Sequence, residues 1–137
     1  MDVAIVGRST DGLHFSDVER GPDGEIWYVW ARLKVAGLDA SWRVSAHYAT
    51  GFDELTEFFH GLAARWRGWE GVRTYESLEH ELRLTAVHDG HVRLAVQLRQ
   101  SSLPDGWLAS AVVQIDPGEE MTQAAEAVRA LLSSPRP

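Results

Sequence analysis

Two histidines and an aspartate lie together in the segment His88-Asp89-Gly90-His91, and these residue types can bind a metal or transfer protons. His47 or His80 could complete a ligand set. However, two histidines three residues apart in a turn match none of the common metal-binding spacings. We therefore expect no metal and no cofactor, with His88 and His91 as only weak candidate ligands and an exposed turn as their ordinary role.

Acid–base chemistry could use Glu79, His80 and Glu81, but neighbouring residues of a strand point to opposite faces. The sequence has no cysteine, no Gly-x-Ser-x-Gly elbow and no Gly-x-x-x-x-Gly-Lys phosphate loop. We assign no catalytic residue, and the pattern favours a protein that is not an enzyme. The catalytic alternative is a small hydrolase that uses the His88–His91 turn.

Aromatic side chains give the candidate binding site, which consists of Phe15, Tyr28, Trp30 and His47. Strand alternation places them on the sheet face opposite the expected helices. Such a cluster is either buried by another part of the chain or forms a contact surface. The segment 69–77 could cover it, or the sheet could curl around it. If the cluster is exposed, we expect a protein or oligomer interface.

The elements that must position these residues are clearest between Leu82 and Leu98, where apolar and polar residues alternate around Asp89-Gly90. A three-residue loop, His88-Asp89-Gly90 with Gly90 in the left-handed conformation, pairs Leu84 with Leu94. All large apolar side chains of both arms then share one face.

The same register extends to the following strand. A loop at Ser101–Gly106 allows Gln100 to pair with Trp107. The buried face then continues through Leu98/Ala109, Val96/Ala111, Leu94/Val113 and Val92/Ile115.

Four strands are expected before this hairpin, at Val3–Val6, Leu13–Arg20, Glu25–Val35 and Ser41–Ala49. Pairing Arg20 with Glu25 places Phe15 beside Trp30.

One helix should begin at Thr50, with Asp53 completing a capping box, and end before Gly68. A second helix should begin at Asp116-Pro117-Gly118-Glu119, while 69–77 is expected to be a loop and 133–137 a frayed tail.

This order predicts one α+β domain spanning residues 1–137, with two layers and the element order ββββ-α-βββ-α. We expect an antiparallel sheet of about seven strands with both helices on one face. A chain of this length can bury a core without disulfides or metal.

The formal net charge of -7 argues against a nucleic-acid partner and is compatible with a basic protein partner. No apolar run has the length of a membrane span, so no membrane association is expected. The start Met1-Asp2-Val3-Ala4 lacks the features of a signal peptide, and we expect a cytoplasmic location.

A family resemblance rests on Trp69-x-Gly71, Ser77-Leu78-Glu79, the run His88-Asp89-Gly90-His91-Val92-Arg93-Leu94, Trp107 and Asp116-Pro117-Gly118-Glu119. These motifs resemble a family of small, uncharacterised actinobacterial proteins, over residues 50–132. The resemblance implies source and compartment but no activity.

The function expected from the sequence is that of a non-catalytic cytoplasmic binding or interaction protein. Its partner is an unknown protein or a second copy of the chain. The acidic α+β outline is also similar to that of toxin-neutralising immunity proteins, which gives the alternative within the binding class.

Overall fold

The computed structural model describes residues 2–100 and 105–133 and is an α+β structure of eight strands and two helices. The predicted element order is confirmed, with one additional strand. Residues 101–104 of the predicted loop 101–106 and residues 134–137 of the predicted tail 133–137 lie outside the described residues. The elements are β1 (Val3–Gly7), β2 (Gly12–Arg20), β3 (Ile26–Val35), β4 (Leu38–Ser45), α1 (Asp53–Ala64), β5 (Arg73–Glu76), β6 (Leu82–His88), β7 (Val92–Arg99), β8 (Leu108–Ile115) and α2 (Glu119–Leu132).

The strands form two antiparallel sheets, in the orders β1-β2-β3-β4 and β5-β6-β7-β8. The prediction of one sheet of about seven strands was therefore wrong in arrangement and short by one strand. The missing strand is β5, which lies within the segment 69–77 that the sequence suggested to be a loop. Its four residues give too short a run for alternation to identify it from sequence.

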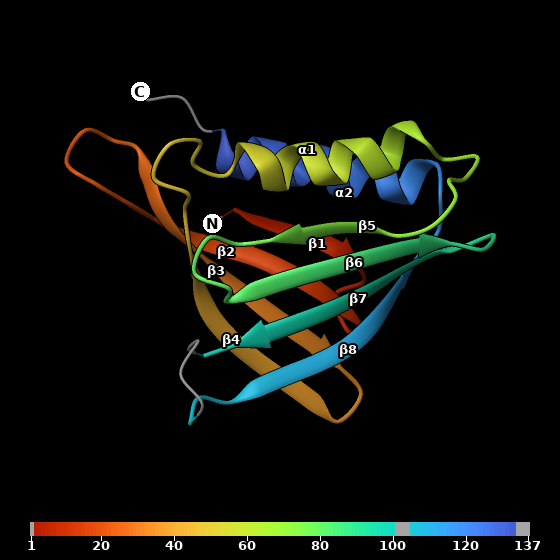
Figure 1. The fold of residues 1–137 in the computed structure, drawn as a ribbon, viewed down its shortest axis with the longest axis horizontal. Coiled ribbons are helices and arrows are strands. Elements are labelled where there is room, and N and C mark those ends of the chain that lie inside the picture. Colours follow the sequence, from red (N-terminus) through yellow and green to blue (C-terminus); the bar gives the residue numbers. More distant parts are fainter. Residues whose placement is uncertain (1, 101–104, 134–137) are drawn as a thin grey trace.

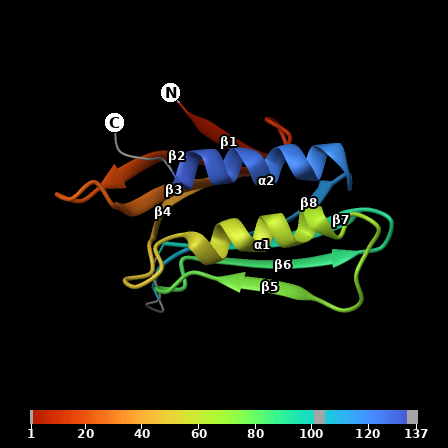
Figure 2. The ribbon, with the colours of Figure 1, turned by 90° about the horizontal axis from the view of Figure 1, so that it is seen from above.

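The two sheets cross one another, and both helices lie together on one side of them (Figure 1). Strand β3 contacts β7 and β8, β4 contacts β7, and α1 and α2 pack against each other. Viewed from above, α2 runs along β1 and α1 lies toward β5 and β6 (Figure 2). Each helix thus follows one sheet in the chain and reaches toward the edge strand of the other.

A continuous core fills the space between the sheets and beneath the helices. Phe15 of β2 meets Phe59 of α1 edge to face, with ring centroids 6.2 Å apart. Alternation directs core side chains inward from β6 and β7, where Leu82, Leu84, Leu94 and further apolar residues are fully buried. The two sheets and both helices therefore share one hydrophobic interior.

The β7–β8 register agrees with the sequence prediction, including the pairs Leu98/Ala109 and Leu94/Val113. In the β6–β7 hairpin the predicted faces are right, but the register differs by two residues. Leu84 pairs with Val96 instead of Leu94. The three-residue loop is 89–91 instead of 88–90, and its Gly90 has a φ of +99°. A shift of two residues preserves the faces because side chains alternate with a period of two.

Both helices begin a few residues later than the sequence indicated. The N-cap of α1 is Phe52 and that of α2 is Gly118, and neither has a side-chain cap. Thr50 and Asp116 are therefore not the N-cap residues. The side chain of Glu120 instead accepts a hydrogen bond from the Asp116 N–H at 2.9 Å.

Candidate functional site

A groove of about 510 Å³ lies at the open end of the β3–β4 hairpin, where β3 begins and β4 ends. Its walls come from the start of β3 and from the segment between β4 and α1. Aromatic rings from both segments line it, together with small and apolar residues. The lining residues are Glu25, Ile26, Trp27, Tyr28, Ser45, Ala46, His47, Tyr48, Ala49 and Gly51.

Backbone hydrogen bonds fix the second wall of this aromatic groove. The Ala46 N–H donates to the Trp27 carbonyl at 2.9 Å, which extends the pairing beyond β4. His47 and Gly51 then exchange N–H to carbonyl bonds of 3.0 and 2.9 Å, closing a tight turn. Gly51 has a φ of +63°, which glycine adopts without strain. This turn carries Tyr48, whose side chain is 87% exposed.

The His47 ring supports the same turn from within. Its Nδ1 accepts hydrogen bonds from the N–H groups of Ala49 and Thr50 at 3.0 and 3.3 Å. The neutral ring consequently carries its proton on Nε2. The ring also stacks on Tyr48, with centroids 4.6 Å apart. His47 thus positions Tyr48 at the groove.

Trp27 forms the exposed part of the opposite wall and is 49% exposed. Its Nε1 donates to a Glu25 carboxylate oxygen at 2.9 Å. A Cβ at Gly21 would lie 2.3 Å from the indole ring, so glycine there lets the ring pack against the β2–β3 turn. The indole is therefore held in place while much of its surface stays in solvent.

Tyr28 and Trp30 are held by a polar layer on the outer face of the first sheet. The Glu19 carboxylate accepts from Trp30 Nε1 at 2.9 Å and from Arg43 Nη1 at 3.1 Å. The Arg43 guanidinium lies 4.1 Å from the centre of the Tyr28 ring, in a cation–π contact. Trp30 also meets Trp42 edge to face. These contacts hold the aromatic side chains in fixed positions.

The structure brings together only part of the predicted binding cluster. Tyr28 and His47 line the aromatic groove. Trp30 is not part of its lining and is hydrogen-bonded to Glu19 on the outer face of the first sheet. Phe15 is 0% exposed and belongs to the core, so its placement on the face of Trp30 was wrong.

The β2–β3 register explains the error at Phe15. Arg20 pairs with Ile26 instead of Glu25, and Ser16 pairs with Trp30, so the ladder lies one residue from the predicted pairing. The bulge between these pairs, where Asp17 takes a φ of +54°, is cancelled by a second shift at Glu19/Arg20. Shifting a strand by one residue exchanges its two faces, and Phe15 therefore pairs with Ala31 and points into the core.

Sequence reasoning missed Trp27 and Tyr48. Alternation places each of them opposite its neighbour in the predicted cluster, Tyr28 or His47, and therefore on the face expected to be core. They lie where the strands end, and there alternation no longer determines burial. The signals in the sequence were Gly21, which leaves room for an indole, and Gly51, which marks a turn next to Tyr48.

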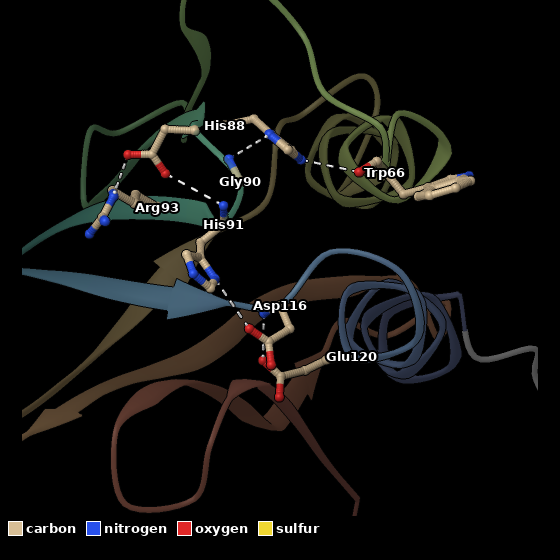
Figure 3. Close-up of polar contacts among 8 residues, drawn as sticks. Trp66, His88, Gly90, His91, Arg93, Asp116 and Glu120 are labelled. Atoms are coloured by element: carbon tan, nitrogen blue, oxygen red, sulfur yellow. Dashed lines mark hydrogen bonds and ion pairs between the residues drawn. The ribbon is translucent and has the colours of Figure 1, made fainter.

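The other candidate, the turn 88–91, makes structural contacts that Figure 3 shows. His88 Nδ1 accepts the Gly90 N–H at 3.3 Å, so its Nε2 carries the proton and donates to the Trp66 carbonyl at 3.1 Å. Trp69 packs edge to face on the same ring. His88 consequently ties the hairpin to the chain that follows α1.

Asp89 and His91 complete this network (Figure 3). The Asp89 carboxylate accepts from Arg93 Nε at 2.8 Å, and this bond is the main reason that its pKa is below the usual value. His91 Nδ1 lies 3.4 Å from an Asp116 carboxylate oxygen. Within residues 2–100 and 105–133, no group of three or more His, Asp or Glu side chains is placed to hold a metal ion.

None of the helices in the described part of the chain has the length and apolar character needed to cross a membrane.

The search of curated proteins and that of solved structures gave no match. One family model matches residues 5–135, nearly the whole chain, and its description is a family of unknown function, DUF6228. Because this match covers residues 5–135, we conclude that the chain belongs to the DUF6228 family.

Proposed function

We propose that this protein is a non-catalytic binding protein of the cytoplasm that contacts a protein partner through the aromatic groove. The observation that carries the proposal is the pair of exposed rings, Trp27 and Tyr48, on opposite walls of the groove. Trp and Tyr are enriched in protein interfaces, where a few of them dominate the binding energy.

Preorganisation supports the same role. A hydrogen bond to Glu25 holds the Trp27 ring, and stacking on His47 holds the Tyr48 ring. The Arg43 guanidinium covers the Tyr28 ring. Rings that are already ordered lose little conformational entropy on binding. The groove is therefore suited to bind a partner without rearrangement.

The test compares the wild-type protein with the double variant Trp27→Ala/Tyr48→Ala in affinity capture from the native cytoplasm, followed by binding measurements on the recovered partner. We expect the variant to bind at least about tenfold more weakly, since an interfacial Trp or Tyr contributes about 2 kcal/mol or more. Sedimentation velocity of both proteins determines whether the partner is a second copy.

The matched control is Val112→Ala, at an exposed apolar residue of β8 outside the groove. It should bind like the wild type. A partner that is lost on Val112→Ala but retained by the double variant would contradict the assignment of the groove. Circular dichroism and thermal unfolding must show that the double variant is folded, because the Trp27 indole packs against the β2–β3 turn at Gly21.

The charge of -7 favours one specific form of this function, an immunity-type protein that neutralises a basic toxin. An adjacent gene for a secreted toxin, together with salt-sensitive binding of that toxin, would support this form. Metabolic neighbours and binding that is insensitive to salt would contradict it.

A further inference from the structure

Strand β5 is the edge of the second sheet, and among the described residues no strand pairs with its outer side. The Ser77 N–H donates to the Leu82 carbonyl at 2.9 Å. This bond shows which residues of β5 direct their backbone groups toward β6. Antiparallel strands bond through every second residue. Thr74 and Glu76 therefore direct their N–H and carbonyl groups away from β6, toward the open edge.

The corresponding edge of the first sheet is covered. Helix α2 packs closely along β1, whereas α1 contacts β5 much less (Figure 2). In the part of the chain that the structure describes, no strand pairs with the outer side of β5. An uncovered edge of this kind is a template for an additional strand.

A groove of about 480 Å³ separates β5 from α1 and gives such a strand room. Phe58 and Tyr75 form an apolar contact there, with ring centroids 6.3 Å apart. Gly61 has no side chain and leaves open space on the α1 side of the groove. A Cβ built at this position would have Arg73 Nη1, at 3.9 Å, as its nearest neighbour. The lining residues are Glu54, Glu57, Phe58, Gly61, Arg73, Thr74, Tyr75 and Glu76.

The charge of the groove specifies the kind of segment that would fit. Glu54 and Glu57 from α1 and Glu76 from β5 face a single cation of the lining, Arg73. All three glutamates are exposed, and Glu76 also contacts His80 Nδ1 at 3.0 Å. A strand added to β5 would direct alternate side chains toward α1 and toward solvent, within reach of these carboxylates.

We propose that the open edge of β5 binds an extended basic peptide segment by strand addition, in the groove beside α1. Backbone pairing with Thr74 and Glu76 supplies affinity, and the three glutamates select lysine or arginine side chains. This site is separate from the aromatic groove, and the proposal does not depend on it.

The probe is a short, capped, fluorescein-labelled peptide in which arginine alternates with valine, measured by fluorescence anisotropy. Thr74→Pro removes the outward N–H while the β5–β6 bonds remain, because proline is tolerated on the open side of an edge strand. We expect Thr74→Pro to weaken binding about tenfold or more, since one lost hydrogen bond of 1.4 kcal/mol is a factor of ten. Thr74→Val keeps the N–H and should bind like the wild type.

Two peptide controls separate backbone pairing from simple charge attraction. The same peptide with alternate amides methylated cannot pair as a strand and should not bind. A peptide with glutamate in place of arginine should also fail. The Tyr48→Ala variant should bind the basic peptide normally, which distinguishes this site from the aromatic groove.

Three results would overturn the proposal. The wild type could fail to bind the basic peptide at any concentration up to millimolar, or folded Thr74→Pro, verified by circular dichroism, could bind it unchanged. A wild-type dimer in sedimentation velocity that Thr74→Pro abolishes would assign the edge to a second copy of the chain.

Discussion

The carboxylate of Asp89 shows how single residues of the candidate turn stabilise structure. Hydrogen bonds from Arg93 and from the His91 N–H lower the pKa of Asp89. A carboxyl group with a lowered pKa in the folded state contributes stability above its unfolded pKa of about 3.9. That contribution disappears as the pH falls through the folded-state pKa.

Asp89→Asn should therefore lower Tm slightly at pH 7, and the difference from wild type should shrink as the pH falls through the lowered folded-state pKa of Asp89. Thermal unfolding measured between pH 2.5 and 7 tests this expectation. Asp105→Asn, at another exposed aspartate, serves as the control for the loss of one carboxylate. A Tm difference for Asp89→Asn that persists at the lowest pH would contradict the role of the carboxylate charge.

The histidines also illustrate why residue types alone do not identify a site. His88 uses both ring nitrogens in hydrogen bonds to backbone groups, and His47 uses Nδ1 in the same way. Both rings thus support turns. The sequence predicted that His88 lies in a turn, but its contact with Trp66 joins residues 22 positions apart, which no local pattern shows.

At the scale of elements, the hairpin of β6 and β7 directs one face into the core and the other outward. Leu94 is fully buried on the inner face, and Val112 of the neighbouring β8 is 57% exposed. This arrangement follows from alternation, because side chains of adjacent residues point to opposite sides of a strand.

Leu94→Ala should reduce the free energy of unfolding by about 2–5 kcal/mol, because it removes buried methyl groups and leaves a cavity. Val112→Ala should change it by no more than about 0.5 kcal/mol. Urea unfolding monitored by tryptophan fluorescence gives both values. Equal losses for the two variants would mean that the faces of the second sheet are wrongly assigned.

The first sheet shows where alternation fails at this scale. Arg20 pairs with Ile26 instead of Glu25, so the β2–β3 ladder lies one residue from the pairing that the turn residues suggested, and Phe15 points inward. The bulge at Asp17 is cancelled by a second shift at Glu19/Arg20 and does not change the face of Phe15. Sequence patterns therefore placed Tyr28 and Trp30 on the same outer face but misplaced Phe15.

At the scale of the whole molecule, Glu81 joins the two sheets. Its side chain is buried, with 7% of the residue exposed, and its carboxylate accepts three hydrogen bonds. The Ser45 N–H and hydroxyl donate at 3.1 and 2.6 Å, and the Ser77 hydroxyl donates at 2.8 Å. The carboxylate thus connects the end of β4 to the loop before β6.

Glu81→Ala would leave these donors without their acceptor, and an unpaired buried polar group costs about 1–3 kcal/mol. We expect a loss of that size in the free energy of unfolding, measured by urea denaturation. Glu79→Ala, in the same loop but exposed, should be nearly neutral. If the two variants unfold alike, Glu81 does not link the sheets energetically.

The sequence by itself determined the element order, the α+β class, the inner face of β6, β7 and β8, and the β7–β8 register. These features depend on short-range patterns of alternation, helical periodicity and turn residues. The aromatic content of the candidate site was also visible, through Tyr28 and His47.

Only the tertiary structure decided that eight strands form two crossing sheets, that β5 is an open edge, and that Trp27 and Tyr48 line one groove. Each of these depends on contacts between segments that are not adjacent in the chain. Alternation with a period of two fixes which side chains share a face, but it does not fix which strands become neighbours.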